Sequence, residues 1–296
     1  MTTQEVHRAG FLTLAGRTNV GKSTLLNRLI GHKVAIVSPK PQTTRRRIVG
    51  IRTDPDAQLI VIDAPGFHQA QHLLNRRMLD TAHRCLAEGE VIALVVEAGR
   101  KLAPEDRDPL QRVLALKRPT VIVINKVDRV ARQLLLPQID ELQRLAPNTE
   151  IVPLSALTGE NVEAFLHVVK GLLPPGPPLM PADEYTDQTE RMLAAEIIRE
   201  KIFHAMRQEI PFSTAVEVEQ FVEEEHLIRI EALIIVARES HKGMVIGAGG
   251  RQLKTIGTHA RLELEELFER KVFLALRVKV EPGWHEDPRK LKELGL

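Results

Sequence analysis

The octapeptide at residues 16–23 has residue types and a spacing suited to holding a phosphate group. It reads Gly16-Arg17-Thr18-Asn19-Val20-Gly21-Lys22-Ser23 and continues into Thr24. Glycines at two of its positions let backbone N–H groups turn inward around an anion. Lys22 would reach the β- and γ-phosphates, and the Ser23 hydroxyl would bind Mg²⁺. Since an apolar run precedes the octapeptide and a helix-like run follows it, we predict a P-loop whose phosphate contacts come from residues 16–24.

A second motif, Asp63-Ala64-Pro65-Gly66, directly follows the apolar run at residues 58–62. Asp63 would hold Mg²⁺ through its water shell, and the Gly66 N–H would touch the γ-phosphate with no side chain in the way. Taken alone this motif is a weak signal, because Asp and Gly are common in turns. Its place after a P-loop and at the end of a predicted strand favours the functional interpretation. The sequence therefore predicts Ser23 and Asp63 as metal ligands.

A third motif, Asn125-Lys126-Val127-Asp128, would select the base of the nucleotide. The Asp128 carboxylate can accept hydrogen bonds from N1–H and N2–H₂ of guanine, and adenine has neither donor in that arrangement. Such a site could discriminate by roughly 10⁴-fold. Ser155-Ala156-Leu157, after the next strand, would add the Ala156 N–H as a donor to guanine O6. GTP and GDP are therefore the expected nucleotides, and Asn125 and Asp128 argue against a P-loop ATPase or helicase.

These motifs need elements that bring them together, and the pattern up to residue 172 alternates strands with helices. Expected strands cover 11–15, 48–53, 58–62, 91–96, 120–124 and 151–152, and expected helices cover 24–29, 73–88, 105–116, 134–145 and 161–172. Near-continuous Val/Ile strands between helices predict an α/β fold with a mostly parallel sheet covered on both faces. The pair 48–53 and 58–62 reads as a hairpin, which adds one antiparallel edge strand. Ligands of such sheets bind beyond the carboxyl ends of the strands, where all three motifs lie.

A proline-rich segment at residues 174–181 interrupts this pattern, because prolines fix φ and remove hydrogen-bond donors. We expect a G domain at residues 1–173, a linker at 174–187 and a second domain at 188–296. The second domain has the order α-β-β-α-α-β with Gly247-Ala248-Gly249-Gly250 between two helices, which is typical of a KH-type RNA-binding module. The predicted RNA contacts are Lys242, Ile246, Gly247, Ala248, Gly249, Gly250, Arg251 and Lys254.

The helix after this glycine loop begins with basic residues, Arg251 and Lys254 among them, and turns acidic from Glu263 to Glu269. This polarity opposes the helix dipole and costs up to ~1 kcal/mol per charge near the ends. Phosphate binding at the basic end explains the arrangement. Aromatic residues make up only 3% of the chain, which argues against recognition by stacking of the RRM type.

Composition sets wider bounds. The 296 residues are 43% hydrophobic and 27% charged with a net charge of +2, as in an ordinary globular protein. Cys85 is the single cysteine, which excludes an intramolecular disulfide and fits a reducing compartment. With no signal segment at the start and no apolar stretch of ~20 residues, we expect a cytoplasmic protein. We also expect a monomer. The segment Lys290-Leu291-Lys292 leaves peripheral association with the inner membrane open, although no strongly amphipathic stretch supports it.

The nucleotide motifs resemble those of the TRAFAC class of GTPases. With Gln42-Thr43-Thr44-Arg45, the second domain and Val278-Lys279-Val280-Glu281-Pro282-Gly283-Trp284 included, the whole chain resembles the Era family of bacterial ribosome-assembly GTPases. The resemblance implies a Mg²⁺-dependent GTPase that binds small-subunit ribosomal RNA near the 3′ end of 16S rRNA, with its nucleotide state gating RNA binding. The alternative is an RNA-binding adaptor that holds nucleotide structurally with negligible turnover.

The resemblance also assigns roles to residues. Residues 38–47 would be switch I, with Thr44 closing on Mg²⁺ and Thr43 as the competing candidate, and residues 63–74 would be switch II. The residues expected to serve hydrolysis are Lys22, Thr44, Gly66 and Asn19. Asn19 would help to hold K⁺, with loop geometry as its alternative role, and Phe67 stands where Ras-like enzymes place a water-orienting Gln. The chain departs from the family pattern at Ala64, where Thr is usual, and at Thr18, where Pro is usual.

Overall fold

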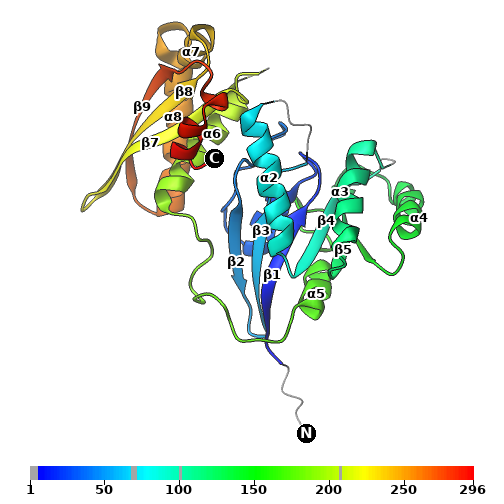
Figure 1. Cartoon of the computed structure of the whole chain (residues 1–296). Coiled ribbons are helices and arrows are strands. Elements are labelled where there is room, and N and C mark those ends of the chain that lie inside the picture. Colours follow the sequence, from blue (N-terminus) through cyan, green and yellow to red (C-terminus); the bar gives the residue numbers. More distant parts are fainter. Residues whose placement is uncertain (1–5, 68–71, 100–101, 207–208) are drawn as a thin grey trace. The chain divides into compact units, whose positions relative to one another are not determined.

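The computed structural model describes residues 6–67, 72–99, 102–206 and 209–296. The chain divides into two compact units (Figure 1), each with its own sheet and helices. Two short inner segments belong to the second unit. The first unit comprises Met1–Ala35, Thr44–Ala70 and Arg77–Asp187, and the second comprises Ile36–Thr43, Gln71–Arg76 and Gln188–Leu296. The chain therefore passes from one unit to the other between Thr43 and Thr44.

The first unit contains a six-stranded sheet in the order β2-β3-β1-β4-β5-β6. Its strands are β1 (Arg8–Ala15), β2 (Ile48–Thr53), β3 (Ala57–Asp63), β4 (Val91–Glu97), β5 (Thr120–Asn125) and β6 (Glu150–Leu154). Only β2 is antiparallel to its neighbour, and all the other pairs are parallel. The predicted hairpin and the mostly parallel sheet are therefore confirmed.

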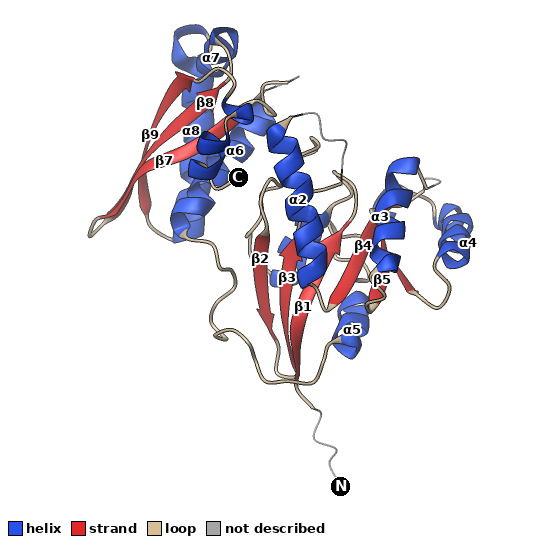
Figure 2. Cartoon of the chain, in the orientation of Figure 1, coloured by secondary structure: helices blue, strands red, loops and turns tan. Residues whose placement is uncertain are grey.

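Helices cover both faces of this sheet, because the strands are apolar on both sides (Figure 2). The helices are α1 (Lys22–Ile30), α2 (Leu73–Glu88), α3 (Pro104–Ala115), α4 (Leu135–Leu145) and α5 (Val162–Leu172), with short 3₁₀ turns η1 (Val127–Arg129) and η2 (Arg132–Leu134). Leu26 of α1 and Phe165 of α5 share one core with Leu12 and Leu14. Leu110 of α3 and Leu142 of α4 share another with Leu94 and other residues that point to the opposite face.

The proline-rich segment is extended, as expected, and it is hydrogen-bonded to the first unit. Gly176 N donates to His7 O at 3.0 Å. The amides of Leu179 and Met180 donate to Gln58 Oε1 of β3, and Ile51 N of β2 donates to Tyr185 O at 2.9 Å. This segment therefore follows the sheet as part of that unit.

The second unit contains a three-stranded sheet in the order β7-β8-β9. Its elements are α6 (Glu190–Ala205), β7 (Thr214–Glu223), β8 (Leu227–Val236), α7 (Glu239–Ile246), η3 (Ala248–Gly250), α8 (Arg251–Phe268), β9 (Lys271–Val280), η4 (Trp284–Glu286) and α9 (Pro288–Glu293). The β7–β8 pair is antiparallel and the β8–β9 pair is parallel. This is the α-β-β-α-α-β order that the sequence predicts for a KH module.

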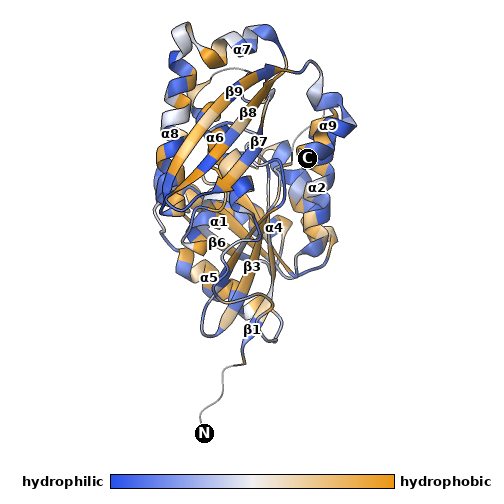
Figure 3. Cartoon of the chain, turned by 90° about the vertical axis from the view of Figure 1, so that its left-hand side faces the viewer, coloured by the Kyte–Doolittle hydropathy of each residue, from blue (hydrophilic) through white to orange (hydrophobic). Residues whose placement is uncertain are grey.

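The core of the second unit lies between its sheet and the helices α6 and α8. Ile198 of α6, Ile230 of β8 and Ala260 of α8 are fully buried in it. Hydrophilic and apolar residues interleave along β8 and β9, so that one side of the sheet is apolar (Figure 3). Among the described residues, no helix is long and apolar enough to cross a membrane.

Candidate functional site

The phosphate-binding loop lies between the end of β1 and the start of α1. Gly16 has φ +141°, and a Cβ atom there would lie 2.4 Å from the carbonyl oxygen of Val95. Gly21 has φ +100°, and its Cβ would lie 2.2 Å from Asn125 Nδ2. Both positions therefore require glycine, for the backbone conformation and for the space. The loop runs into the N-terminus of α1, which favours an anion.

Lys22, the first residue of α1, is buried within this loop. Its Nζ atom donates to the carbonyl oxygens of Gly16 at 3.2 Å and Arg17 at 2.9 Å. The pKa of Lys22 is lowered from 10.5 to about 8, chiefly by burial, while the charge of Asp63 opposes this shift and that of Arg17 adds to it. A phosphate in the loop would supply the negative charge that favours the protonated amine.

The hydroxyls of Ser23 and Thr44 meet the carboxylate of Asp63 at the end of β3. Ser23 Oγ lies 2.9 Å from Thr44 Oγ1 and 2.5 Å from Asp63 Oδ2, and Thr44 Oγ1 lies 3.3 Å from Asp63 Oδ2. Burial raises the pKa of Asp63, although Lys22 and the two hydroxyls lower it in part. The structure thus brings together Ser23 and Asp63, which the motifs predict as metal ligands, and Thr44, which the resemblance implies as the third.

A Mg²⁺ ion fits this cluster, because Mg²⁺ prefers hard oxygen ligands. The Oδ1 atom of Asp63 is buried and has no hydrogen-bond partner among the described residues. A buried carboxylate oxygen without a partner is costly, and a cation would compensate it. When bound, the ion would supply charge neutralisation for the phosphates.

Thr43 and Thr44, the two alternatives for the switch threonine, have different surroundings. Thr43 Oγ1 donates to Lys40 O at 2.8 Å, and Thr43 O accepts from Arg199 Nη2 at 2.6 Å. Only Thr44 contacts Ser23 and Asp63. The geometry therefore favours Thr44 as the residue that meets the metal.

The segment Ile36–Thr43 is held by hydrogen bonds to α6 within the second unit. Val37 N donates to Glu200 Oε1 at 2.8 Å, and Val37 O lies 3.1 Å from His204 Nε2. Lys40 Nζ donates to two carbonyl oxygens at the end of the helix, those of Phe203 and Met206. Lys40 therefore caps the negative end of the helix dipole. Sequence reasoning did not predict these long-range contacts.

Asn125 connects the loop to the predicted base-binding residues. Its Nδ2 atom donates to Val20 O at 2.8 Å, and its Oδ1 atom accepts from Ala156 N at 2.9 Å. Ser155 Oγ donates to Asp128 Oδ1 at 2.6 Å, which orients the carboxylate. The expected donor to guanine O6, Ala156 N, is thus engaged with Asn125 in this structure.

The phosphate-binding loop is also held by ion pairs, which the sequence did not predict. Arg17 pairs with Glu97 and with Asp106, both at 2.9 Å. Lys126 Nζ donates to Asn19 O at 2.7 Å and pairs with the same Glu97 at 3.2 Å. Glu97 and Asp106 come from β4 and α3, and no local motif marks them.

Gly66 and Phe67 close the loop from the other side. A Cβ at Gly66 would lie 2.6 Å from Thr18 N, so a side chain there would displace the phosphate loop. Phe67 N donates to Gly16 O at 3.2 Å, and Phe67 is 7% exposed. Phe67 packs with Ala15 and Leu94 in the core and has no polar group to orient a water molecule.

The glycine loop of the second unit has the backbone that only glycine adopts easily. Gly247, Gly249 and Gly250 have φ values of +71°, +59° and +76°. Residues 248–250 form the 3₁₀ turn η3, from which α8 begins at Arg251. Ala248 and Gly249 are exposed, so the backbone of the turn is accessible to a ligand.

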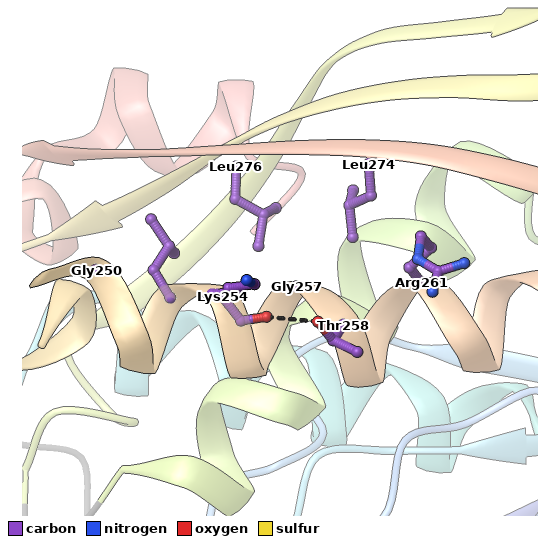
Figure 4. A pocket seen from close by; sticks show the side chains of 8 residues that line it. Gly250, Lys254, Gly257, Thr258, Arg261, Leu274 and Leu276 are labelled. Atoms are coloured by element: carbon purple, nitrogen blue, oxygen red, sulfur yellow. Dashed lines mark hydrogen bonds between the residues drawn. The ribbon is translucent and has the colours of Figure 1, made fainter.

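A groove of about 370 Å³ lies between α8 and β9 (Figure 4). Leu274 and Leu276 point from β9 toward α8. The residues that line it are Gly250, Leu253, Lys254, Gly257, Thr258, Arg261, Leu274 and Leu276. Of the predicted RNA contacts, only Gly250 and Lys254 line this groove. The others, Lys242, Ile246, Gly247, Ala248, Gly249 and Arg251, lie in α7, in the turn and at the start of α8.

Helical spacing was the signal for the residues that were missed. Gly257 and Arg261, which were not predicted, follow the predicted Lys254 by three and seven positions, so the three residues share a face of α8. Arg261 also pairs with Glu265 at 2.7 Å. The groove therefore combines an apolar wall from β9 with a basic rim from α8.

The fold and the sites define a P-loop GTPase domain joined to a KH domain. Residues 11–126 match the family described as 50S ribosome-binding GTPase, and residues 209–285 match the KH domain. The chain is 49% identical to GTPase Era of Geotalea uraniireducens over 294 residues, 99% of each chain. It is 46% identical to GTPase Era of Syntrophus aciditrophicus over 290 residues, 97% of this chain and 95% of the relative. This chain belongs to the Era family of GTPases.

Two solved structures are similar over nearly the whole chain. A variant of Aquifex aeolicus Era bound to GDP and AlF₄⁻ has 39% identity and a TM-score of 0.95, covering 97% of this chain and 99% of that one. Era in complex with MgGDPNP and nucleotides 1506–1542 of 16S ribosomal RNA has 40% identity and a TM-score of 0.95, covering 98% and 99%.

Proposed function

We propose that this Mg²⁺-dependent GTPase binds the 3′ end of small-subunit ribosomal RNA and acts in assembly of the small ribosomal subunit, with its nucleotide state gating RNA binding. The main support for this gating is that two consecutive residues, Thr43 and Thr44, belong to different units. Thr44 contacts the predicted metal site, and Thr43 is bonded to Arg199 of α6. Loss of the γ-phosphate that moves Thr44 would therefore also move Thr43 and weaken its hydrogen bond to Arg199.

The proposed RNA ligand rests on the groove beside α8 and on the family. The KH module brings a glycine turn close to the sugar–phosphate backbone of about four nucleotides. Arg251, Lys254 and Lys242 would meet the phosphates, while Leu274 and Leu276 would contact the bases. A relative with 40% identity is known in complex with the 3′-terminal part of 16S ribosomal RNA, which supports this ligand.

For hydrolysis, Lys22 and the Gly66 N–H would stabilise the charge that develops on the γ-phosphate. Ser23, Thr44 and Asp63 would hold the Mg²⁺. Phe67 has no polar group, so attack by water would depend on a different device.

We propose K⁺ as that device, held with the help of Asn19, which is exposed and has φ +63°. Turnover in KCl and in NaCl at matched ionic strength tests it with the wild type and Asn19→Ala. Faster turnover in KCl, lost in the variant, is expected. Equal turnover rates in KCl and NaCl would contradict a role for K⁺.

The gating is tested by the affinity for a single-stranded RNA with the sequence of the 16S 3′ end, measured with a GTP analogue, with GDP and without nucleotide. We expect the affinity of the wild type to depend on the nucleotide. Lys40→Met removes the contacts to Phe203 O and Met206 O, so this dependence should shrink. Lys117→Met, at an exposed lysine after α3, is the matched control. An affinity that is equal in all three states would contradict the gating.

Turnover separates this function from the passive adaptor. GTP hydrolysis measured with and without the same RNA, and with small ribosomal subunits, should be catalytic and should respond to them. Negligible turnover under all conditions would favour the adaptor.

The domain bounds 1–173, 174–187 and 188–296, a monomeric state and a cytoplasmic location belong to the same proposal. For the C-terminal segment, Leu291 is fully buried and Lys290 pairs with Glu217 at 2.9 Å. These contacts give no support to an apolar face that could bind a membrane. Peripheral association with the membrane stays a prediction, which a flotation assay with lipid vesicles would test.

A further inference from the structure

Two histidines and a glutamate come together in the second unit, away from the groove beside α8. One ligand atom from each of His72, His285 and Glu286 lies within 4.8 Å of the others. His72 Nδ1 lies 3.0 Å from Glu286 Oε1, and the rings of His72 and His285 are 5.2 Å apart at an interplanar angle of 79°. None of these three residues has a part in the nucleotide site or the RNA groove.

The turn that carries His285 and Glu286 is well anchored. Both residues belong to η4, which begins after Gly283 with φ +71°. Trp284, between Gly283 and His285, is 2% exposed, and its Nε1 atom donates to Ser213 O at 3.1 Å. Glu286 N donates to Gly283 O at 2.8 Å. The positions of the two ligand-bearing residues are therefore set by the core of the second unit.

His72 lies directly before α2, and the Glu286 carboxylate holds it there. Glu286 Oε2 accepts from Leu73 N at 3.2 Å, while Glu286 Oε1 faces His72. His72 O accepts from Arg76 N at 3.0 Å, which starts the helix. The side chains of His72 and Glu286 are 53% and 45% exposed, so an ion from solution has access to them.

We propose that His72, His285 and Glu286 bind a divalent transition-metal ion, with Zn²⁺ as the expected species. Imidazole nitrogen suits Zn²⁺, Ni²⁺ and Cu²⁺, whereas Mg²⁺ prefers oxygen ligands, so this site and the nucleotide site would take different ions. Zn²⁺ binds nitrogen and oxygen at about 2.0–2.2 Å, which puts neighbouring tetrahedral ligands about 3.3 Å apart. His72 Nδ1 and Glu286 Oε1 are 3.0 Å apart, close to that spacing, and the ligand atom of His285, within 4.8 Å of the others, would move nearer when the ion binds. A water molecule would complete the set.

A bound metal ion would connect the start of α2 to the turn η4 near the C-terminus. The segment Gln71–Arg76 belongs to the second unit, and its start follows the Asp63-Ala64-Pro65-Gly66 motif by a few residues. Bound metal would hold Leu73 and His72 against η4 more firmly than the hydrogen bonds to Glu286 do alone.

Trp284 provides the probe, because it is the only tryptophan in the chain and its ring is 5.9 Å from that of His285. Co²⁺ is added to the full chain loaded with GDP and excess Mg²⁺, and the fluorescence of Trp284 is followed. We expect saturable quenching with one ion per chain, reversed by Zn²⁺ and unaffected by further Mg²⁺. No quenching, or quenching reversed by Mg²⁺, would overturn the proposal.

Variants make the assignment specific. His72→Ala and Glu286→Gln should each weaken Co²⁺ and Zn²⁺ binding by at least about tenfold, since loss of a supporting residue alone typically costs 10–100-fold. Glu286→Gln retains an oxygen for Leu73 N and so isolates the charge. His226→Ala is the matched control, because His226 is an exposed histidine beside Glu225 in the turn between β7 and β8. Circular dichroism verifies that each variant is folded, and unchanged affinity in both site variants would refute the site.

Discussion

The Oγ atom of Ser23 lies 2.5 Å from the Oδ2 atom of Asp63, and the second carboxylate oxygen, Oδ1, is buried without a hydrogen-bond partner in the described part of the chain. The carboxylate is thus satisfied on one side only. A residue chosen for folding alone would not leave this atom unpaired, because an unsatisfied buried acceptor costs about 1–3 kcal/mol. The arrangement is suited to a cation that arrives with the nucleotide.

Asp63→Asn tests this relationship. Burial raises the pKa of Asp63, which means that the charged form is less favourable in the folded protein than in the unfolded chain. We expect the neutral variant to melt about 2–4 °C higher without nucleotide, a gain of about 1 kcal/mol. Mg²⁺-dependent GTP turnover should fall by about 100-fold or more. Thermal unfolding and turnover at varied Mg²⁺ provide the measurements, and a destabilised variant with normal turnover would contradict the expectation.

Lys22 should make nucleotide affinity depend on pH. Its pKa is lowered to about 8 chiefly by burial, and bound phosphate would raise it again, so binding takes up a proton above pH 8. The affinity for GDP should therefore decline above pH 8, by at most about tenfold per pH unit. Titrations with a fluorescent GDP analogue between pH 7 and pH 9 measure this.

The same shift has a consequence for stability. Between pH 8 and pH 10.5 the unfolded chain binds a proton at Lys22 that the folded chain does not, so this residue makes stability without nucleotide rise with pH there. Lys22→Arg stays charged and should lose both pH dependences. A wild-type affinity that is flat up to pH 9 would argue against the assignment.

Asp128→Asn should change the preferred base. The Ser155 hydroxyl holds Asp128 Oδ1 at 2.6 Å, so the carboxylate is oriented before nucleotide binds. The affinity for GTP should fall by up to about 10⁴-fold, the size of the base discrimination that Asp128 could provide. Xanthosine triphosphate should bind better than it does to the wild type. Asp140→Asn, at an exposed position of α4, is the control. Competition assays that find the same base preference in the variant would count decisively against the pocket.

Gly257→Leu should block the groove beside α8. A Cβ at Gly257 would already lie 3.4 Å from Leu276 Cδ1, so a larger side chain would fill the space between helix and strand. We expect at least a tenfold loss of RNA affinity in a gel-shift or anisotropy assay. Gly171→Leu provides the matched substitution, since Gly171 is a helical glycine in α5 with open space around it. If both variants bind RNA as the wild type does, the ligand does not use this groove.

Much of this architecture could be predicted from local patterns. Gly16, Asp63 and Asn125 each stand at the end of an apolar strand, and parallel strands bring such ends to one edge of a sheet. The α-β-β-α-α-β order likewise follows from the periodicity of apolar residues. These features depend on residues that are close in sequence, which is why periodicity and spacing suffice.

The features that could not be predicted depend on contacts between distant residues. Spacing did not choose between Thr43 and Thr44, because the choice depends on distant partners: the Thr44 hydroxyl meets Asp63, whereas the Thr43 carbonyl accepts from Arg199. The wall that β9 gives to the groove depends on how Leu276 faces α8 across the intervening turn. His72 and Glu286 are 214 positions apart, and no motif connects them.

The extended segment at residues 174–187 has an effect beyond connecting two parts of the chain. β2 is one of the two edge strands of its sheet, and an edge strand offers unpaired amides that can pair with another polypeptide and start aggregation. Tyr185 O takes up the amide of Ile51, and Thr186 forms an antiparallel bridge with Gly50 and donates its hydroxyl to Val49 O. Cleavage of a peptide bond within residues 174–187 would expose the aggregation-prone edge of β2 as well as separate the two domains. The solubility of the protein would therefore depend on this segment being intact.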